Sequence, residues 1–173
     1  MKLARLVVPM AALALFAGCS TPTGGTAFEV AGQRVSMAQV EDAAAGCAGL
    51  VQQDSQALTG EVARMMLSGQ LAEAVAEKTS TAVDPAKRSQ ALKQLQGEEL
   101  LADEDCAVAV NGFADYAVIN QELGQDKVRS AIKSLDVEVN PRFGGWDEAR
   151  GTFSGTSGSL SMEDISSGEI LGR

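Results

Sequence analysis

Few residues of this chain have the types and the spacing that catalysis requires. Ser130 and Lys133 have the S-x-x-K spacing in which a lysine takes the proton of a nucleophilic serine, but the S-D-N and K-T-G elements of that chemistry are missing from the sequence. We therefore interpret this pair as part of the solvated face of a surface helix. The sequence also contains no histidine, which excludes Ser-His-Asp and Cys-His catalysis and the commonest zinc ligand.

The clustered acidic residues fit structural roles better than chemical ones. Asp103, Glu104 and Asp105 lack the ligand spacing and glycine turn of a calcium loop, and they stand where a helix N-terminus favours negative charge. Glu98 and Glu99 are adjacent, so on a helix they face different directions, which does not suit paired-carboxylate catalysis. The sequence therefore predicts no catalytic residue, no metal site and no cofactor.

Cys19 has the clearest chemistry in the chain. It follows Ala17 and Gly18, as in a bacterial lipobox, where the cysteine receives a diacylglyceryl group before cleavage, although Phe16 stands in place of the usual leucine. The alternative is an ordinary secretory signal with a chance cysteine, but Leu15 and Ala17 make a poor small-x-small cleavage site. We therefore predict that Cys19 is lipidated.

The other two cysteines, Cys47 and Cys106, form an even pair once Cys19 is assigned to lipid. Each falls on an apolar helical stripe, and export would place both where disulfides form and persist. We expect a disulfide between positions 59 residues apart, from 47 to 106. Two buried free thiols that behave as small hydrophobic groups are the alternative.

The N-terminal segment predicts where the protein is found. Lys2 and Arg5 accompany an apolar run over residues 6–17, which is shorter than the ~20 residues that a membrane-spanning helix needs. This pattern is typical of a cleaved signal peptide, here residues 1–18, followed by a lipidated tether over residues 19–26. We predict a mature protein anchored by its lipid to the extracytoplasmic face of the cell membrane.

Composition limits the class of partner. The predicted signal peptide takes two of the 14 basic residues and none of the 23 acidic ones, so the mature chain has a net charge of −11. Such a chain is repelled by phosphate backbones, which argues against nucleic-acid binding. Abundant alanine and an aromatic content of 4% indicate close-packed helices, and the length suits one domain with a hydrophobic core.

The elements that position these residues follow from periodicity and capping patterns. Residues 28–36 alternate apolar and polar around Gly32, which predicts a hairpin or a bent strand. Ser36 and Gln39 form a capping box that opens the first helix. Later helices are expected over about 61–78, 86–95, 103–123 and 125–135, with a strand over 136–140. The Gly- and Ser-rich residues 149–173 predict a flexible tail.

The helix expected over 61–78 is apolar on two nearly opposite faces. Leu67, Leu71 and Val75 form one stripe. The other stripe consists of Leu58, Val62, Met65, Gly69, Ala72 and Ala76. Such a helix either lies at the centre of a bundle or exposes one face as a binding surface. The central position is the commoner of these two arrangements.

The segment Val137-Glu-Val-Asn-Pro-Arg-Phe-Gly-Gly-Trp-Asp147 is the most specific pattern in the chain. Together with the opening strand at 28–36 and the Asp84-Pro85 helix restart, it resembles the N-terminal domain of SurA/PrsA-type chaperones, in the short lipoprotein version found in actinobacteria. The motif residues are Val139, Asn140, Pro141, Arg142, Phe143, Gly144, Trp146 and Asp147. Phe143 departs from the family, where tyrosine is common. We expect a structural role for the motif: Pro141 ends the strand and Trp146 packs back on the domain.

The resemblance implies a mainly α domain over residues 27–148, closed by a short sheet that pairs the first strand with the C-terminal strand. It also implies a hydrophobic cradle for unfolded exported polypeptides. It implies no isomerase activity, because the parvulin-type domain is a separate module in full-length relatives and this chain has no room for it. The residues expected to line the cradle are Leu67, Leu71, Val75, Phe113 and Tyr116.

The expected function is therefore a membrane-anchored chaperone that holds unfolded exported polypeptides without catalysis. A binding module with one dedicated envelope partner is the main alternative, and a peptidyl-prolyl isomerase is a weaker one.

Overall fold

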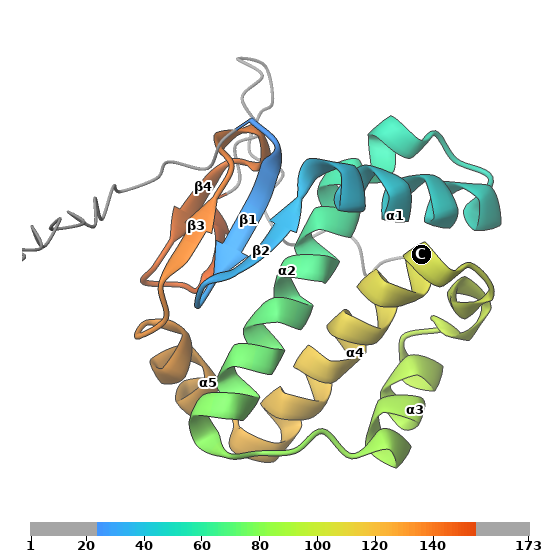
Figure 1. Cartoon of the computed structure of the whole chain (residues 1–173). Helices are drawn as coiled ribbons and strands as arrows, with labels where there is room; N and C mark the ends of the chain where they lie inside the picture. Colours follow the sequence, from blue (N-terminus) through green and yellow to red (C-terminus); the bar gives the residue numbers. More distant parts are fainter. Residues whose placement is uncertain (1–23, 155–173) are drawn as a thin grey trace, which may run out of the picture.

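The computed structural model describes residues 24–154 and places most of them in α-helices, with a small sheet beside them (Figure 1). Its helices are α1 (Met37–Val51), α2 (Ser55–Thr79), α3 (Pro85–Gln94), α4 (Glu104–Leu123) and α5 (Gln125–Ile132), with 3-10 helices η1 (Glu98–Ala102) and η2 (Pro141–Phe143). Its strands are β1 (Thr26–Val30), β2 (Gln33–Ser36), β3 (Val137–Val139), β4 (Gly145–Asp147) and β5 (Thr152–Ser154). The predicted mainly α fold is confirmed. The predicted signal peptide, Cys19 and most of the predicted tail lie outside the described residues.

The three-stranded sheet is built around β1, which lies between β2 and β3 and pairs antiparallel with both. Phe28 faces Val35 on one side and Val139 on the other, and its side chain is fully buried. Ala31 and Gly32 join β1 to β2 and both have positive φ, as a two-residue type I′ turn requires. The predicted hairpin and the expected pairing of the opening strand with the strand near 136–140 are thus confirmed.

Side-chain caps fix where four of the helices begin. In the capping box of α1, the backbone N–H of Gln39 donates to Ser36 Oγ (3.2 Å) and the backbone N–H of Ser36 donates to Gln39 Oε1 (2.8 Å). Asp84 and Asp103 cap α3 and α4, as predicted. Asp54 caps α2, so this helix begins more than a turn earlier than predicted.

Helix α2 is the centre of the domain and packs against α1, α4, α5 and β1. Both of its apolar stripes contribute to the core, with Val62 and Ala72 buried on one side and Leu67 on the other. The central arrangement of this helix, which its two-sided pattern favoured, is therefore correct.

Two glycines allow α2 and α4 to cross in close contact. A Cβ atom added to Gly69 would lie 2.7 Å from the Cα of Gly112, and one added to Gly112 would lie 2.9 Å from the Cα of Gly69. No larger residue fits at either position without a shift of the backbone, so this glycine pair sets how closely the two helices approach.

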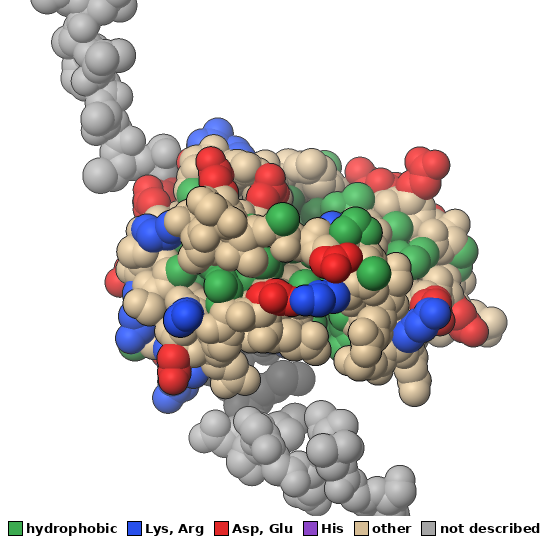
Figure 2. Space-filling view, turned by 90° about the horizontal axis from the view of Figure 1, so that it is seen from below, with side chains coloured by type: hydrophobic (Ala, Val, Ile, Leu, Met, Phe, Trp, Pro, Cys, Tyr) green, Lys and Arg blue, Asp and Glu red, His purple; other side chains and the backbone are tan. Residues whose placement is uncertain are grey.

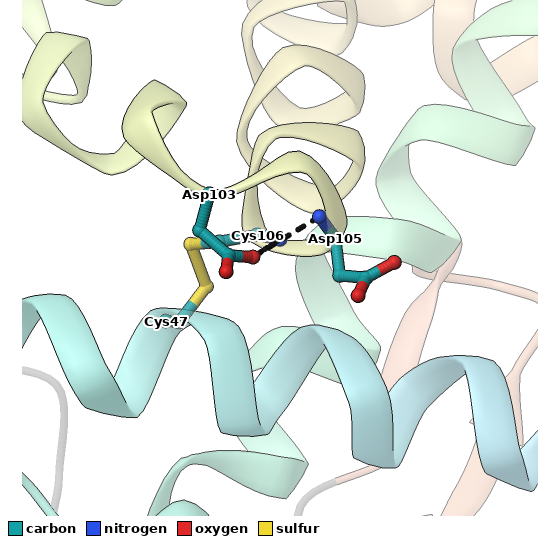
Figure 3. The surroundings of a disulfide bond; sticks show 4 residues. All are labelled: Cys47, Asp103, Asp105 and Cys106. Atoms are coloured by element: carbon teal, nitrogen blue, oxygen red, sulfur yellow. Dashed lines mark hydrogen bonds between the residues drawn. A yellow bond between two sulfur atoms is a disulfide. The ribbon is translucent and has the colours of Figure 1, made fainter.

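The predicted disulfide forms between Cys47 of α1 and Cys106 in the first turn of α4 (Figure 3). Both cysteines are buried, at 4% and 0% exposure. Beside them, the carboxylate of Asp103 accepts hydrogen bonds from the backbone N–H groups of Asp105 (3.1 Å) and Cys106 (3.0 Å). A Cβ at Gly46 would lie 2.0 Å from Asp103 Oδ1, so α1 needs glycine here to approach the cap of α4.

The C-terminal boundary differs from the prediction. The tail was expected to begin at residue 149, but residues 152–154 form β5, which pairs antiparallel with β4. Trp146 and Phe153 are register partners in this hairpin. Ordered structure therefore continues at least through Ser154, because residues 152–154 pair with the backbone of β4. The composition of this short stretch alone does not predict that pairing.

Charged side chains of both signs are interspersed over the face seen in Figure 2, with small hydrophobic patches between them. Within the described part of the chain, no helix combines the length and the apolar character that crossing a bilayer requires.

Candidate functional site

Four of the five predicted cradle residues line one groove. Leu67 and Leu71 come from α2, Phe113 and Tyr116 come from α4, and Trp146 of β4 joins them from the closing segment. The hollow has a volume of about 380 Å³. Its other lining residues are Glu61, Arg64, Met65, Ser68, Arg150 and Gly151. We call it the aromatic groove.

The groove has an apolar floor and aromatic walls. Leu67 and Leu71 are almost fully buried, at 2% and 3% exposure, so they reach the groove only along its floor. Phe113 remains 36% exposed, and Tyr116 and Trp146 are half-buried. Large, partly exposed aromatic surfaces above an apolar floor are suited to receive an apolar side chain from another molecule.

The prediction that Val75 lines the cradle is wrong. Its side chain has 0% exposure and belongs to the hydrophobic core. Val75 shares a helical stripe with Leu71, but α2 is covered along this part of its length because it is the central helix of the domain. Spacing along α2 therefore identified the face of the helix that carries Leu67 and Leu71, but it did not show that the groove ends before Val75.

Asn140 fixes the closing segment that carries Trp146. Its side-chain Nδ2 donates to the carbonyl of Thr26 (2.8 Å), and its backbone N–H donates to the carbonyl of Ala27 (2.8 Å). Its Oδ1 accepts a hydrogen bond from the backbone N–H of Arg142 (3.0 Å), which starts η2. Gly144 then adopts a φ of +99°, which turns the chain into β4. The motif at 139–147 thus has a structural role in the described residues: it holds Trp146 against the core.

The turn after β4 completes the groove. Asp147 Oδ1 accepts a hydrogen bond from the backbone N–H of Arg150 (3.0 Å), and the carbonyl of Asp147 accepts one from Gly151 (2.7 Å). Gly151 has a φ of +66°, and a Cβ there would lie 3.1 Å from Ile132 Cγ2. Arg150 and Tyr116 also line a smaller adjoining hollow of about 200 Å³.

Three arginines stand around these two hollows. Arg64, Arg129 and Arg150 each lie three residues from a carboxylate partner, at distances of 3.4, 3.7 and 3.6 Å respectively. At least half of each arginine side chain is exposed, so these pairs are weak and can be exchanged for others. Two of them, Arg64 and Arg150, line the aromatic groove, each beside its own carboxylate partner, Glu61 or Asp147.

A second, larger hollow lies on the opposite side of α2. It has a volume of about 890 Å³, and we call it the polar groove. Its helical lining includes Gln70, Glu73 and Glu77 of α2, and Val108, Asn111 and Asp115 of α4. Positions 70, 73 and 77 fall on the face of α2 opposite to positions 64, 68 and 71, because successive helical residues are separated by about 100°.

An ion pair closes one end of the polar groove. Arg88 of α3 donates from Nε to Asp115 Oδ1 (2.5 Å) and from Nη2 to Asp115 Oδ2 (2.8 Å). The hydrogen bond to Asp115 raises the pKa of Arg88, and the hydrogen bond to Glu122 likewise raises the pKa of the neighbouring Lys87. Both bases therefore stay charged at neutral pH, and the pair serves to link α3 to α4.

Among residues 24–154, no group of three or more His, Cys, Asp or Glu side chains could hold a metal ion. The two cysteines described are joined in a disulfide, so neither supplies a thiolate. Comparison with known proteins finds no matching family model, no matching curated protein and no matching solved structure.

Trp146 is the aromatic groove residue that the sequence did not place in the cradle. Its position in the closing motif indicated that it packs on the domain, which is correct, but not that it lines the same groove as Phe113 and Tyr116. The available signal was composition, because Trp146 is the single tryptophan of the chain.

Proposed function

We propose that this protein is an exported, lipid-anchored domain that binds apolar segments of unfolded polypeptides in the aromatic groove, without catalysis. The observation that carries the proposal is the convergence of Leu67, Leu71, Phe113, Tyr116 and Trp146 on one hollow, although they come from three separate elements. The resemblance to SurA/PrsA-type chaperone domains supports the same class of ligand.

The shape of the groove favours short apolar stretches over whole folded partners. A volume of about 380 Å³ accommodates a few side chains, and the half-buried aromatic rings offer area at little cost in side-chain entropy. The exchangeable arginines at its edge would then favour segments in which acidic residues accompany apolar ones.

Trp146 gives a direct test, because every tryptophan signal of the chain comes from the groove. A reduced, permanently unfolded model polypeptide is titrated against the mature chain while Trp146 emission is recorded, and its aggregation is followed in parallel. We expect a saturable emission change and slower aggregation. No effect at several-fold molar excess of the protein would contradict the proposal.

Two matched variants assign the binding to one side of the α2–α4 pair. Phe113→Gln removes an aromatic wall of the aromatic groove, and Val108→Gln alters an exposed apolar residue of the same helix in the polar groove. We expect Phe113→Gln to weaken binding about tenfold, the effect of losing roughly 1.4 kcal/mol. Val108→Gln should leave the affinity unchanged.

The alternative of one dedicated envelope partner has its own supporting observation, the size and hydrogen-bonding lining of the polar groove. Side-chain amides and carboxylates there suit a partner of defined structure better than many apolar clients. The same two variants separate the alternatives, because loss of binding in Val108→Gln alone would favour a dedicated partner.

The predicted anchor is tested by mass spectrometry of the membrane fraction. We expect an N-terminal Cys19 that carries a diacylglyceryl group. An intact Met1 and an unmodified thiol at position 19 in soluble cell contents would reject both export and anchoring.

A further inference from the structure

The β4–β5 hairpin delivers the C-terminal part of the chain to the aromatic groove. Gly151 lines the groove, and Ser154, the last described residue, pairs with Gly145 beside Trp146. Residue 155 therefore starts within three or four residues of the groove lining, a chain distance of about 10–14 Å at most. Any ligand carried by the following segment is held close to this site.

The printed sequence after Ser154 contains a stretch with the composition that the groove favours. Residues 159–165 read Ser-Leu-Ser-Met-Glu-Asp-Ile, in which three apolar side chains accompany an acidic pair. Leu160 is six residues beyond Ser154, and six extended residues span about 20 Å, so the chain is long enough to turn back from Ser154 to the groove lining at Trp146 and Gly151.

Charge supports the same match. Glu163 and Asp164 would meet the edge at which Arg64 and Arg150 stand, and would compete there with Glu61 and Asp147 for these arginines. The side chains of these arginines are 58% and 80% exposed, and their present carboxylate partners lie at 3.4 and 3.6 Å. Exchange of one carboxylate partner for another costs little at such exposed sites.

We propose that residues 159–165 bind the aromatic groove of their own chain as an intramolecular ligand. This inference rests on the proposed function in one respect: the segment competes with client polypeptides for the same surface. A tethered ligand has an effective concentration of about 1 mM, so even a weak segment occupies the groove for a substantial part of the time. A client of higher affinity displaces it, whereas weakly apolar polypeptides are excluded.

The test uses Trp146 in the full mature chain, without any client present. The variant Leu160→Ser/Met162→Ser/Ile165→Ser removes the apolar side chains of the segment, and Ser157→Ala/Ser166→Ala/Ser167→Ala changes three flanking residues as a control. Quenching of Trp146 emission by acrylamide reports how far the groove is covered. We expect the quenching constant to rise about twofold in the first variant, as for a segment bound roughly half of the time, and to stay unchanged in the control.

Equal quenching in the parent chain and in both variants would overturn the inference. A difference in quenching between the parent chain and the first variant that disappears on dilution would also overturn it. Such a result would mean that the segment binds the groove of a second copy of the chain. Client titration of the same proteins separates this inference from the proposed function. If the variant Leu160→Ser/Met162→Ser/Ile165→Ser binds the client about twofold more tightly than the parent chain, the result supports both the intramolecular ligand and the proposed function. Increased quenching in a protein that binds no client supports the intramolecular ligand and rejects the proposed function.

Discussion

The two grooves beside the α2–α4 crossing are made by the same pair of helices, yet they differ in size and lining. The polar groove is the larger, at about 890 Å³ against about 380 Å³, and amide and carboxylate side chains alternate in its lining with apolar ones such as Val35, Met66 and Val83. No aromatic ring is among the described residues that line it, and the Arg88–Asp115 ion pair stands at its edge. The aromatic groove is smaller, and the closing segment contributes Trp146 to its lining.

This contrast teaches that volume alone does not identify a binding site in a small helical domain. A hollow whose lining can hydrogen-bond to water has little free energy to gain from a ligand that displaces the water. Covering exposed aromatic surface with a ligand, in contrast, lowers the free energy. Helix α4 supplies Phe113 and Tyr116 to this side, and the closing segment adds Trp146.

The largest expected effect comes from the disulfide. It should stabilise the whole helical domain against unfolding and therefore does not distinguish the two grooves. Replacing Cys47 and Cys106 together by alanine removes the link between α1 and α4 and should lower the free energy of unfolding by about 2–5 kcal/mol. Urea unfolding followed by circular dichroism measures the loss. The parent protein should show the same loss under reducing conditions, and the double variant should be insensitive to reductant. A smaller effect in the parent would mean that reduction of the buried bond is incomplete.

A smaller loss is expected at the crossing that separates the grooves. Gly112→Ala places a Cβ 2.9 Å from the Cα of Gly69, which forces the two helices apart and should cost about 1–3 kcal/mol. Gly60→Ala is the matched control, since nothing lies within 4 Å of a Cβ there and alanine favours a helix by about 0.5–1 kcal/mol. If both variants gained stability, the close approach of α2 and α4 would be incorrect.

Asn140→Ala should affect one groove and leave the other intact. The substitution removes the hydrogen bond to the Thr26 carbonyl and the acceptor for the Arg142 N–H, at a cost of about 1–2 kcal/mol. It loosens the segment that carries Trp146, so acrylamide quenching should increase. Asn111→Ala, in the polar groove, is the comparison and should leave the quenching unchanged. Unchanged Trp146 quenching in both variants would mean that Asn140 does not hold this wall in place.

The smallest effect is expected from Arg88→Lys in the polar groove. Lysine cannot reproduce the two parallel hydrogen bonds to Asp115, but the pair is partly exposed, so we expect a loss of only about 0.5–1 kcal/mol. Affinity for the model client should not change. A clear fall in affinity with unaltered stability would assign client binding to the polar groove and reverse the comparison.

Local signals were sufficient to predict most of the fold. The capping box at Ser36 and the carboxylate caps at Asp84 and Asp103 place three helix starts correctly, because each acts within a single turn of backbone. The even pair of cysteines left after Cys19, each on an apolar stripe, also predicted the Cys47–Cys106 disulfide.

The features that were missed depend on contacts between distant parts of the chain. The glycines at 69 and 112 matter only because α2 and α4 cross there, and β5 forms only because β4 lies beside it. The same reason explains why the lining of the aromatic groove was predicted only in part. Helical spacing identifies the face of α2 that carries Leu67 and Leu71, but where the groove ends beyond Leu71 depends on how neighbouring elements cover the helix.

The position of Asn140 also bears on how the domain responds to mechanical force. Because β1 and β3 are antiparallel, the start of β1 and the end of β3 lie side by side, joined by the bonds from Asn140 to Thr26 and Ala27. Tension that draws these two ends apart would break the hydrogen bonds between β1 and β3 one after another, beginning with the bonds from Asn140 to Thr26 and Ala27. Force applied between Thr26 and the closing segment would therefore act first on the side of the groove that carries Trp146.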